Sequence, residues 1–269
     1  MRVESMSGDE VMVLIISAVG GAMAWYRWYS ATLVRALVVR NASRSTFVVW
    51  PVICMVLLHA ILRSWAADDV RDSGTYMTFY MVAGAAWVGF FAQFCGLLGI
   101  SPRDDAVERQ NLAAALAMAG ALAGITFCFA GGNVGDGPGW WVVAFSAGLS
   151  TGALFGLWAV VEWFTGISES VTVERSGGAG LRLGGFLAGT GMILGRAVAG
   201  DWVSAAATVR DFAVVAWPVL PLAGVAVIIE WFRPLDVNAR TEDSAAGLFV
   251  ASVYIAASFL YVFVWQGMP

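Results

Sequence analysis

The sequence contains no lysine, so all 15 of its basic residues are arginine. Without a lysine the chain cannot form a retinal or pyridoxal-phosphate Schiff base, and it cannot contain a P-loop. The single histidine, His59, excludes a bis-histidine haem and a histidine-rich zinc site. Cys54, Cys95 and Cys128 lie in apolar runs without Cys-x-x-Cys spacing, which is typical of small buried residues. We therefore expect no cofactor and no bound metal.

Charged residues are also scarce. They make up 13% of the chain, against 59% hydrophobic residues, whereas soluble domains carry about a quarter charged residues. Apolar runs recur that are as long as the roughly 18 residues needed for a membrane-spanning helix. They predict an all-α, polytopic integral membrane protein with about eight transmembrane helices, forming one domain over 1–269. The predicted spans are 11–30, 47–66, 77–99, 112–131, 140–164, 180–200, 212–232 and 245–265.

The arginines predict an orientation. Loops 31–46, 100–111, 165–182 and 233–244 hold nine arginines, and the opposite side holds five. By the positive-inside rule, the first group faces the cytoplasm and both termini face outward. The two groups are Arg35, Arg40, Arg44, Arg103, Arg109, Arg175, Arg182, Arg233 and Arg240 inside, and Arg2, Arg63, Arg71, Arg196 and Arg210 outside.

Sequence features recur about every 67 residues. Arg27, Cys95, Glu162 and Glu230 occupy matching places near span ends and are separated by 68, 67 and 68 residues. A repeat that contains two spans enters the membrane the same way each time, unlike an inverted repeat. We expect four parallel helical-hairpin repeats over 11–70, 77–137, 140–202 and 212–269.

Glycines at a spacing of four residues mark the expected packing surfaces, because small residues let helices approach closely in lipid. They occur in the fourth, fifth and sixth predicted spans, and Pro218 and Pro221 are expected to kink the seventh. The glycines are Gly120 and Gly124, then Gly148, Gly152 and Gly156, then Gly185, Gly189, Gly191 and Gly195.

Residues 101–115, Ser-Pro-Arg-Asp-Asp-Ala-Val-Glu-Arg-Gln-Asn-Leu-Ala-Ala-Ala, lead into Gly120 and Gly124. This stretch resembles the YjfL-like bacterial membrane proteins (domain of unknown function 350), a family whose unit has about four helices. The resemblance is carried by 77–200 and implies two such units in tandem. It implies fold and no activity. Gly177-Gly178 stands in the second copy where Gln110-Asn111 stands in the first, so a role for Asn111 in a transport path arises at most once.

Glu162 and Glu230 are the first candidates for a transport path. Repeated carboxylates at membrane depth can carry protons or cations. Because each precedes a tryptophan near a span end, both are equally typical of the aromatic belt at the membrane interface.

Arg63 and Arg196 each precede an aspartate, Asp68 or Asp201, by five residues, and Asp136 occupies the matching place between them. They predict a charged outer mouth, or arginines that reach toward lipid headgroups. His59 lies four residues before Arg63 and is a candidate proton relay or a packing residue. The glycine-rich loop 131–139 is interpreted as a flexible vestibule or as a tight turn.

The leading hypothesis is a bacterial inner-membrane transport or channel-like protein for an ion or small solute. A scaffold that anchors a partner in the membrane, or a homo-oligomer, is the alternative. A weak third candidate is an intramembrane hydrolase, because Gly148-Leu149-Ser150-Thr151-Gly152 matches Gly-x-Ser-x-Gly. That motif requires a strand-to-helix turn, and here it lies in an apolar helix. The expected partner is the lipid bilayer, and the short loops carry no nucleic-acid signature.

Overall fold

The computed structural model describes residues 6–36, 42–232 and 240–267, except for the side chains at 31–36, 42–44 and 240–243. Within these ranges every regular element is a helix, so the chain is an all-α polytopic membrane protein. Of the arginines used for the predicted orientation, Arg2, Arg40 and Arg233 lie outside the described residues, as do the side chains of Arg35, Arg44 and Arg240.

The first half of the chain contains four long helices. They are α1 (Gly8–Ala36), α2 (Ala42–Trp65), α4 (Gly74–Ala92), which continues as the 3-10 helix η1 (Gln93–Leu98), and α5 (Leu112–Gly131). The short α3 (Asp68–Asp72) joins α2 to α4, and a π-helix, η2 (Pro102–Glu108), joins η1 to α5. Side chains begin two of these helices: Ser73 accepts a hydrogen bond from Tyr76 N, and Asn111 accepts from Ala113 N and Ala114 N.

The second half is also helical throughout its described residues. It contains α6 (Trp140–Thr165), the short α7 (Ile167–Thr172), α8 (Gly177–Val198), α9 (Ala205–Ala216), α10 (Val219–Trp231) and α11 (Arg240–Leu260), which ends in the π-helix η3 (Tyr261–Trp265). The α6 helix ends at Gly166, whose positive φ of 59° forms a left-handed cap.

Six of the described helices are long and apolar enough to span a membrane, and α9 with α10 makes a seventh if the bent pair counts as one span. The expected kink is present, since these two helices meet at an angle of 46° beside Pro218. The predicted span 180–200 differs from the others: α8 is a helix of 22 residues but is not among the six. Arg182 and Arg196 lower its apolar character, and protein rather than lipid surrounds it.

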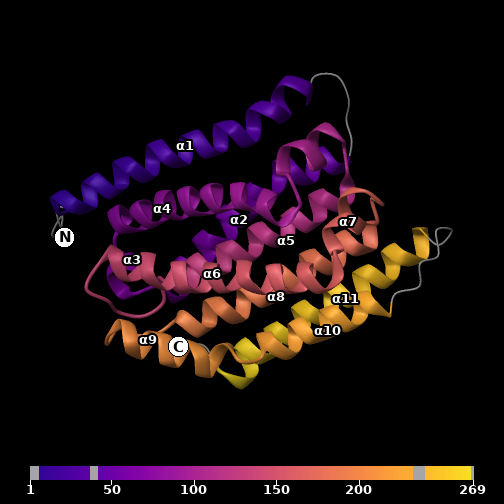
Figure 1. The fold of residues 1–269 in the computed structure, drawn as a ribbon. Coiled ribbons are helices and arrows are strands. Elements are labelled where there is room, and N and C mark those ends of the chain that lie inside the picture. Colours follow the sequence, from indigo (N-terminus) through magenta and orange to yellow (C-terminus); the bar gives the residue numbers. More distant parts are fainter. Residues whose placement is uncertain (1–5, 37–41, 233–239, 268–269) are drawn as a thin grey trace.

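The long helices run alternately in opposite directions, so the two termini lie at the same end of the bundle (Figure 1). We call this the terminal end; it also carries α3 and the loops 132–139 and 199–204. The opposite end carries η2, α7 and the loops 100–111 and 166–176, and we call it the arginine-loop end because Arg103, Arg109 and Arg175 lie there.

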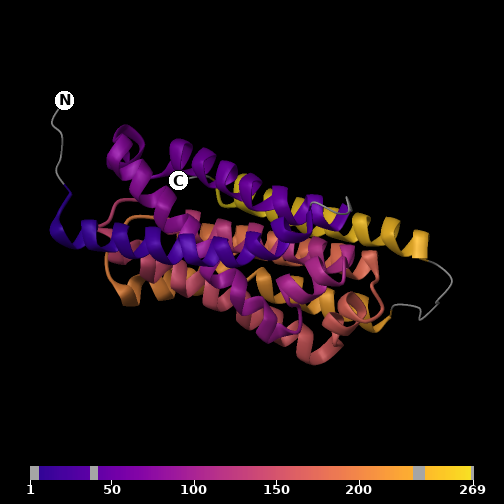
Figure 2. The ribbon, with the colours of Figure 1, turned by 90° about the horizontal axis from the view of Figure 1, so that it is seen from above.

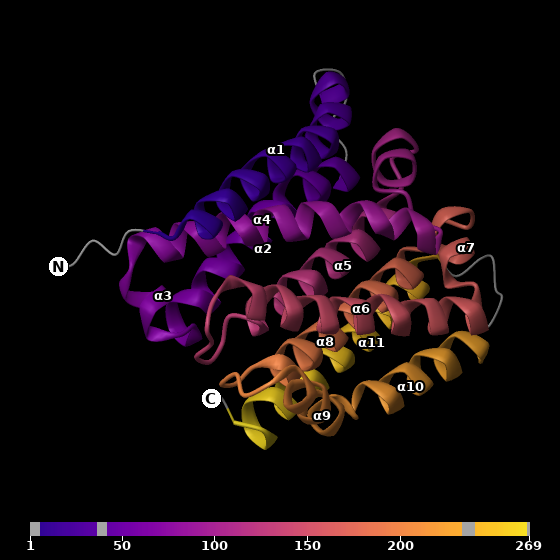
Figure 3. The same ribbon diagram turned by 60° about the vertical axis from the view of Figure 1, so that its left-hand side comes forward.

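The core is the pair α5 and α8, which make the most extensive helix contact in the described structure. In Figure 2, α2 and α11 lie along one face of this pair and α6 along the opposite face. In Figure 3, α1, α4, α6 and α10 follow one another across the molecule in chain order. The helices therefore form two layers, with α2, α5, α8 and α11 in the second.

Glycine permits the contact between α5 and α8. A Cβ atom built on Gly120 would lie 2.0 Å from Gly184 O, and one on Gly191 would lie 2.3 Å from Gly124 Cα. The opposite side of α8 is equally close to α11, because a Cβ on Gly185 would lie 2.5 Å from Ala251 Cα. At Gly195 and Gly189 the nearest atoms are likewise backbone or side-chain atoms of α5 and α11, within 3 Å. The backbones of three helices thus touch along α8.

The glycine stripe of α6 behaves differently from the prediction. Gly152 and Gly156 are exposed and have no neighbouring atom within 4 Å of a built Cβ, and Gly148 only approaches the ring of Trp87 at 3.9 Å. The prediction that these three glycines form a packing surface inside the chain is therefore wrong. They lie on the outer, membrane-facing side of α6.

Several hydrogen bonds connect residues 60 to 69 positions apart. Trp25 Nε1 donates to Ala85 O, Trp50 Nε1 to Ala119 O and Trp231 Nε1 to Phe164 O. These bonds connect neighbouring long helices that lie about one predicted hairpin apart in the sequence. The internal repeat itself stays a prediction.

Candidate functional site

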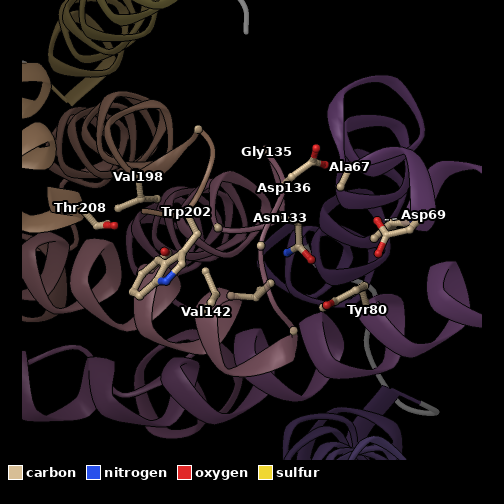
Figure 4. Close-up of a pocket in the computed structure, with 17 residues that line it drawn as sticks. Ala67, Asp69, Tyr80, Asn133, Gly135, Asp136, Val142, Val198, Trp202 and Thr208 are labelled. Carbon is tan, nitrogen blue, oxygen red and sulfur yellow. Dashed lines mark hydrogen bonds between the residues drawn. The ribbon is translucent and has the colours of Figure 1, made fainter. Parts of the chain in front are cut away.

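A cavity of about 210 Å³ opens at the terminal end of the bundle. Its wall combines the end of the α2–α3 connection, α4, the loop after α5, the start of α6 and the α8–α9 connection, so it joins segments from three predicted hairpins (Figure 4). The lining residues are Ala67, Asp69, Val70, Tyr80, Gly132, Asn133, Gly135, Asp136, Gly137, Gly139, Val142, Val143, Ser146, Val198, Gly200, Trp202 and Thr208.

Two loops hold this cavity in shape. Gly200 N donates to Val134 O, Trp202 N donates to Asp136 O, and Asp136 N donates to a carboxylate oxygen of Asp201, each at 2.8 Å. Gly135 has φ 105°, and a Cβ there would lie 2.3 Å from Gly200 C, so only glycine fits the position. The loop 131–139, which the sequence left open as vestibule or turn, forms both a tight connection and the cavity wall.

Asn133 is the most deeply placed polar residue of the wall. It is 3% exposed, and its amide nitrogen donates to Phe129 O at 2.8 Å, which fixes the orientation of the amide. Its amide oxygen, Oδ1, is buried and has no hydrogen-bond partner. Buried acceptors are almost always paired, so this oxygen marks a place where a donor from outside the chain belongs.

Tyr80 and Asp69 stand on the same side of the cavity as this oxygen. Figure 4 shows the Tyr80 hydroxyl turned toward the Asn133 amide, with the Asp69 carboxylate beside them. Tyr80 is 8% exposed. One oxygen of Asp69 accepts from Val70 N at 2.8 Å, which leaves the other available. Sequence reasoning missed Asn133 and Tyr80, because neither residue belongs to a recognisable motif.

A second polar site lies inside the arginine-loop end. Arg182 of α8 donates from Nε to one Glu230 oxygen at 2.5 Å and from its terminal nitrogen to the other at 3.0 Å. The two side chains are 6% and 8% exposed. Around the pair lie Val161, Ile167, Leu183, Phe186, Ala226 and Tyr254. The sequence assigned Arg182 to a cytoplasmic loop, whereas the structure buries it in the bundle as the partner of Glu230.

Glu162 has a different environment from Glu230, despite the matching sequence position. Its two oxygens accept hydrogen bonds from Ser168 N at 2.9 Å and from Ser168 Oγ at 2.5 Å. It is partly buried at the arginine-loop end and anchors the start of α7 to the end of α6. The structure therefore gives Glu162 a local structural role, and it does not bring Glu162 to the Arg182–Glu230 pair.

The outer arginines do not pair with the aspartates five residues on. The Arg63 guanidinium donates to Arg71 O, and Asp68 pairs with Arg71. Arg196 donates to Gly267 O at 3.0 Å and to Ala199 O at 3.5 Å. His59 is exposed on α2 together with Arg63. The predicted charged mouth thus takes a different form, in which the Asp201 carboxylate and the Asp136 backbone hold the loops, and no described arginine forms an ion pair with either aspartate.

A single path lined by Glu162, Arg196 and Glu230 does not form in this structure. Arg182, which binds Glu230, precedes Arg196 by 14 residues on α8, a separation of about 21 Å at 1.5 Å per residue. Arg196 belongs to the terminal end and both glutamates belong to the arginine-loop end. The candidate residues therefore divide into two groups at opposite ends of the bundle.

Asn111 serves the helix that follows it. Its side-chain oxygen accepts from Ala113 N at 3.0 Å and Ala114 N at 3.4 Å, and its amide nitrogen donates to Val171 O at 2.7 Å. At 2% exposure it caps α5 and fastens α7 against it. These contacts give Asn111 a structural role at the start of α5 and do not require a role in transport.

Ser150 lacks the surroundings of a nucleophile. Its hydroxyl is fully buried and lies within hydrogen-bonding distance of three carbonyl oxygens, those of Ser146, Ala147 and Cys128, at 2.9 to 3.3 Å. His59 is exposed on the surface of α2, so the two do not form a Ser–His pair. The geometry gives the hydrolase hypothesis no support.

Comparison of the chain with known protein families, with curated proteins and with solved structures finds no match to any of them. The resemblance to the YjfL-like proteins stays an expectation. The two polar sites described above are therefore the features that bear on function.

Proposed function

We propose that the chain is a membrane transport protein for a small polar solute or ion, which enters from the cavity at the terminal end. The observation that carries the proposal is this polar cavity with a buried, unpaired acceptor at Asn133. Convergent polar groups in a concave site are the usual mark of a ligand site. In the proposed orientation the protein lies in the bacterial inner membrane, with the arginine-loop end in the cytoplasm.

The proposed route follows the seam between α6 and α8. Arg182, Phe186 and Thr190 follow one another along one side of α8 at a spacing of four residues, and Val198, the last residue of α8, lines the cavity. On α6, Ser146 lines the cavity and Val161 lines the Arg182–Glu230 site. The seam therefore connects the two polar sites. No solute passes between α5 and α8, because their backbones touch.

Two buried polar side chains, one on α6 and one on α8, have no hydrogen-bond partner, and we infer that both face this seam. Thr190 Oγ1 and Trp158 Nε1 are buried and unpaired, and a buried unpaired group costs about 1–3 kcal/mol. A solute or water that passes along the seam would satisfy both groups. The break between α9 and α10 beside Pro218 supports the same interpretation, since transporters often contain broken helices near their pathway.

The Arg182–Glu230 pair closes the route at the arginine-loop end in this conformation. Its bidentate geometry fills the space between α8 and α10. A passing cation would compete with Arg182 for Glu230, and the separation of the pair would open this end. In this proposal the route is open from the terminal end only while the pair is intact.

Proteoliposome flux tests the proposal. The protein is reconstituted, and uptake of ammonium, methylammonium, Na⁺, K⁺ and protons is measured under an imposed gradient. We expect flux of at least one of them, reduced about fivefold or more by Thr190→Val, which removes one hydrogen-bonding group worth about 1 kcal/mol. Thr126→Val is the matched control, because Thr126 is equally buried but already donates to Leu122 O. Absence of flux for the whole panel would overturn the proposal.

The scaffold alternative has one observation in its favour. Gly152 and Gly156 are exposed on α6 with open space beside them, and such glycine stripes accept a helix of another chain in membranes. Gly152→Leu would then change the oligomeric state or release a partner in nanodiscs without altering the fold. If the variant and the wild type form complexes of the same mass in nanodiscs, the support for a scaffold is removed.

A further inference from the structure

We propose that the cavity at the terminal end binds a primary ammonium group carrying a short alkyl chain. This inference rests on the proposed function in taking the cavity as the entry site, and it names the class of solute. It is drawn from three features of the wall: an unpaired acceptor, carboxylates in a lining without arginine or histidine, and apolar side chains opposite the acceptor.

The unpaired acceptor is the amide oxygen of Asn133. The chain itself orients it, because the amide nitrogen is held by Phe129 O and Ala67 N donates to the Asn133 backbone oxygen. The remaining oxygen therefore presents lone pairs to the cavity and can only accept. A ligand that donates hydrogen bonds satisfies it, whereas a carboxylate or phosphate would place acceptor against acceptor.

The Tyr80 hydroxyl and the Asp69 carboxylate supply the other acceptors. They lie on the same side as Asn133 in Figure 4, and no described residue is hydrogen-bonded to the Tyr80 hydroxyl. An ammonium group has three donors and no acceptor, so it matches an amide oxygen, a hydroxyl oxygen and a carboxylate.

The charge of the wall has one sign. Asp69 and Asp136 line the cavity, and the lining contains no arginine or histidine. A cation is therefore attracted and an anion repelled. A multidentate metal site is not favoured, because no group of three His, Cys, Asp or Glu side chains among the described residues is placed to hold a metal ion. Acceptors of mixed type around an open space fit an ammonium group better.

The opposite side of the cavity carries apolar side chains together with the Thr208 hydroxyl. Trp202, Val142 and Val198 lie there in Figure 4. The volume of about 210 Å³ is many times the 10–15 Å³ or so that one water needs. An alkyl chain of a few carbons fits between these side chains while its ammonium group reaches Asn133. The indole of Trp202 adds an aromatic surface at the cavity wall.

Binding to the purified full-length chain tests the inference. Binding of radiolabelled methylammonium to protein in nanodiscs is measured by scintillation proximity, with competition by propylammonium, propanol, acetate, Na⁺ and K⁺. We expect saturable binding, tighter competition by propylammonium than by methylammonium, and no competition by propanol or acetate. Equal competition by propanol, stronger competition by Na⁺ or K⁺, or no saturable binding would each overturn the proposal, the last of these meaning that the cavity holds only water.

Two pairs of variants locate the site. Tyr80→Phe removes one hydrogen bond to a charged group and Asp69→Asn removes the negative charge, and each should weaken methylammonium binding about tenfold or more. Tyr76→Phe and Asp72→Asn are the matched controls on the same two helices, since neither residue lines the cavity. Equal effects in the test variants and the controls would contradict the assignment.

The binding assay separates this inference from the transport proposal. Methylammonium binding without flux would leave the ammonium site standing and overturn transport. Flux of another solute without methylammonium binding would support transport and overturn the ammonium site.

Discussion

Arg182 and Glu230 form a two-pronged ion pair between α8 and α10, with hydrogen bonds of 2.5 and 3.0 Å and almost no exposure. Residues 48 positions apart are thereby joined inside an apolar bundle. A charge removed from water is costly, and its partner compensates only while the pair is intact.

Loss of one partner should destabilise the protein more than loss of both. We expect Glu230→Gln to lower the free energy of unfolding by about 3–5 kcal/mol, because Arg182 is then buried without a counter-charge. The double variant Arg182→Met with Glu230→Leu should recover most of this loss. Unfolding in mixed micelles, followed by circular dichroism, measures the difference. Glu108→Gln is the control: Glu108 pairs with the exposed Arg103, and such surface pairs contribute only about 0–1 kcal/mol.

Alanine substitutions should separate the glycines of the core from those of the surface. Gly120→Ala would place a methyl group against Gly184 backbone atoms, and we expect a loss of about 1–3 kcal/mol or more. Gly156→Ala meets open space and should change stability by less than about 1 kcal/mol, in the stabilising direction, because alanine favours the helix. The same unfolding measurement distinguishes them. Equal losses for both would contradict the packing described for α8.

Both the amide oxygen and the amide nitrogen of Asn111 should contribute to the stability of the protein. We expect Asn111→Ala to cost about 1–2 kcal/mol for the lost helix cap, and more because Val171 O also loses its donor. Asn111→Ser keeps a capping oxygen and loses the donor to Val171 O, so its cost should be smaller. Hydrogen exchange of α5 and α7 measures the effects separately. A flux loss in Asn111→Ser with unchanged exchange would instead indicate a transport role.

Ser150 should be chemically inert. A fluorophosphonate probe is expected to leave the wild-type protein unlabelled, because the hydroxyl is buried and faces helix carbonyls. Ser150→Ala should leave flux and fold unchanged. Labelling of the wild type that disappears in Ser150→Ala would restore the hydrolase hypothesis.

Local composition was sufficient to predict most of the helices. Apolar runs and helix-capping residues act within one segment, so spans such as Leu112–Gly131 and Trp140–Thr165 were predicted within a few residues. The position of α8 in the sequence was also predicted correctly. Its environment was not, because α8 is buried among other helices and is not one of the six apolar spans. Its arginines and glycines are explained by contacts with α5, α10 and α11, which no window of sequence contains.

The candidate sites also depend on contacts between helices that the sequence alone does not reveal. The glycine stripes of α6 and α8 have the same spacing, and only the packed structure shows that one meets backbone while the other meets open space. Glu162 and Glu230 occupy matching positions, yet a serine six residues on binds one and an arginine of another helix binds the other. The unpaired amide oxygen of Asn133 could not be predicted from the sequence, because it depends on which donors the folded chain places near it.

The glycines on both sides of α8 also limit how this protein can move. The backbone of α8 is in close contact with α5 on one side and with α11 on the other. No layer of side chains separates these helices, so α8 cannot easily slide or rotate by itself. We therefore expect these three helices to move together. In the proposed transport cycle, the arginine-loop end would then be opened by a movement of α6 and the α9–α10 pair relative to them, and the bend beside Pro218 offers the place for a hinge.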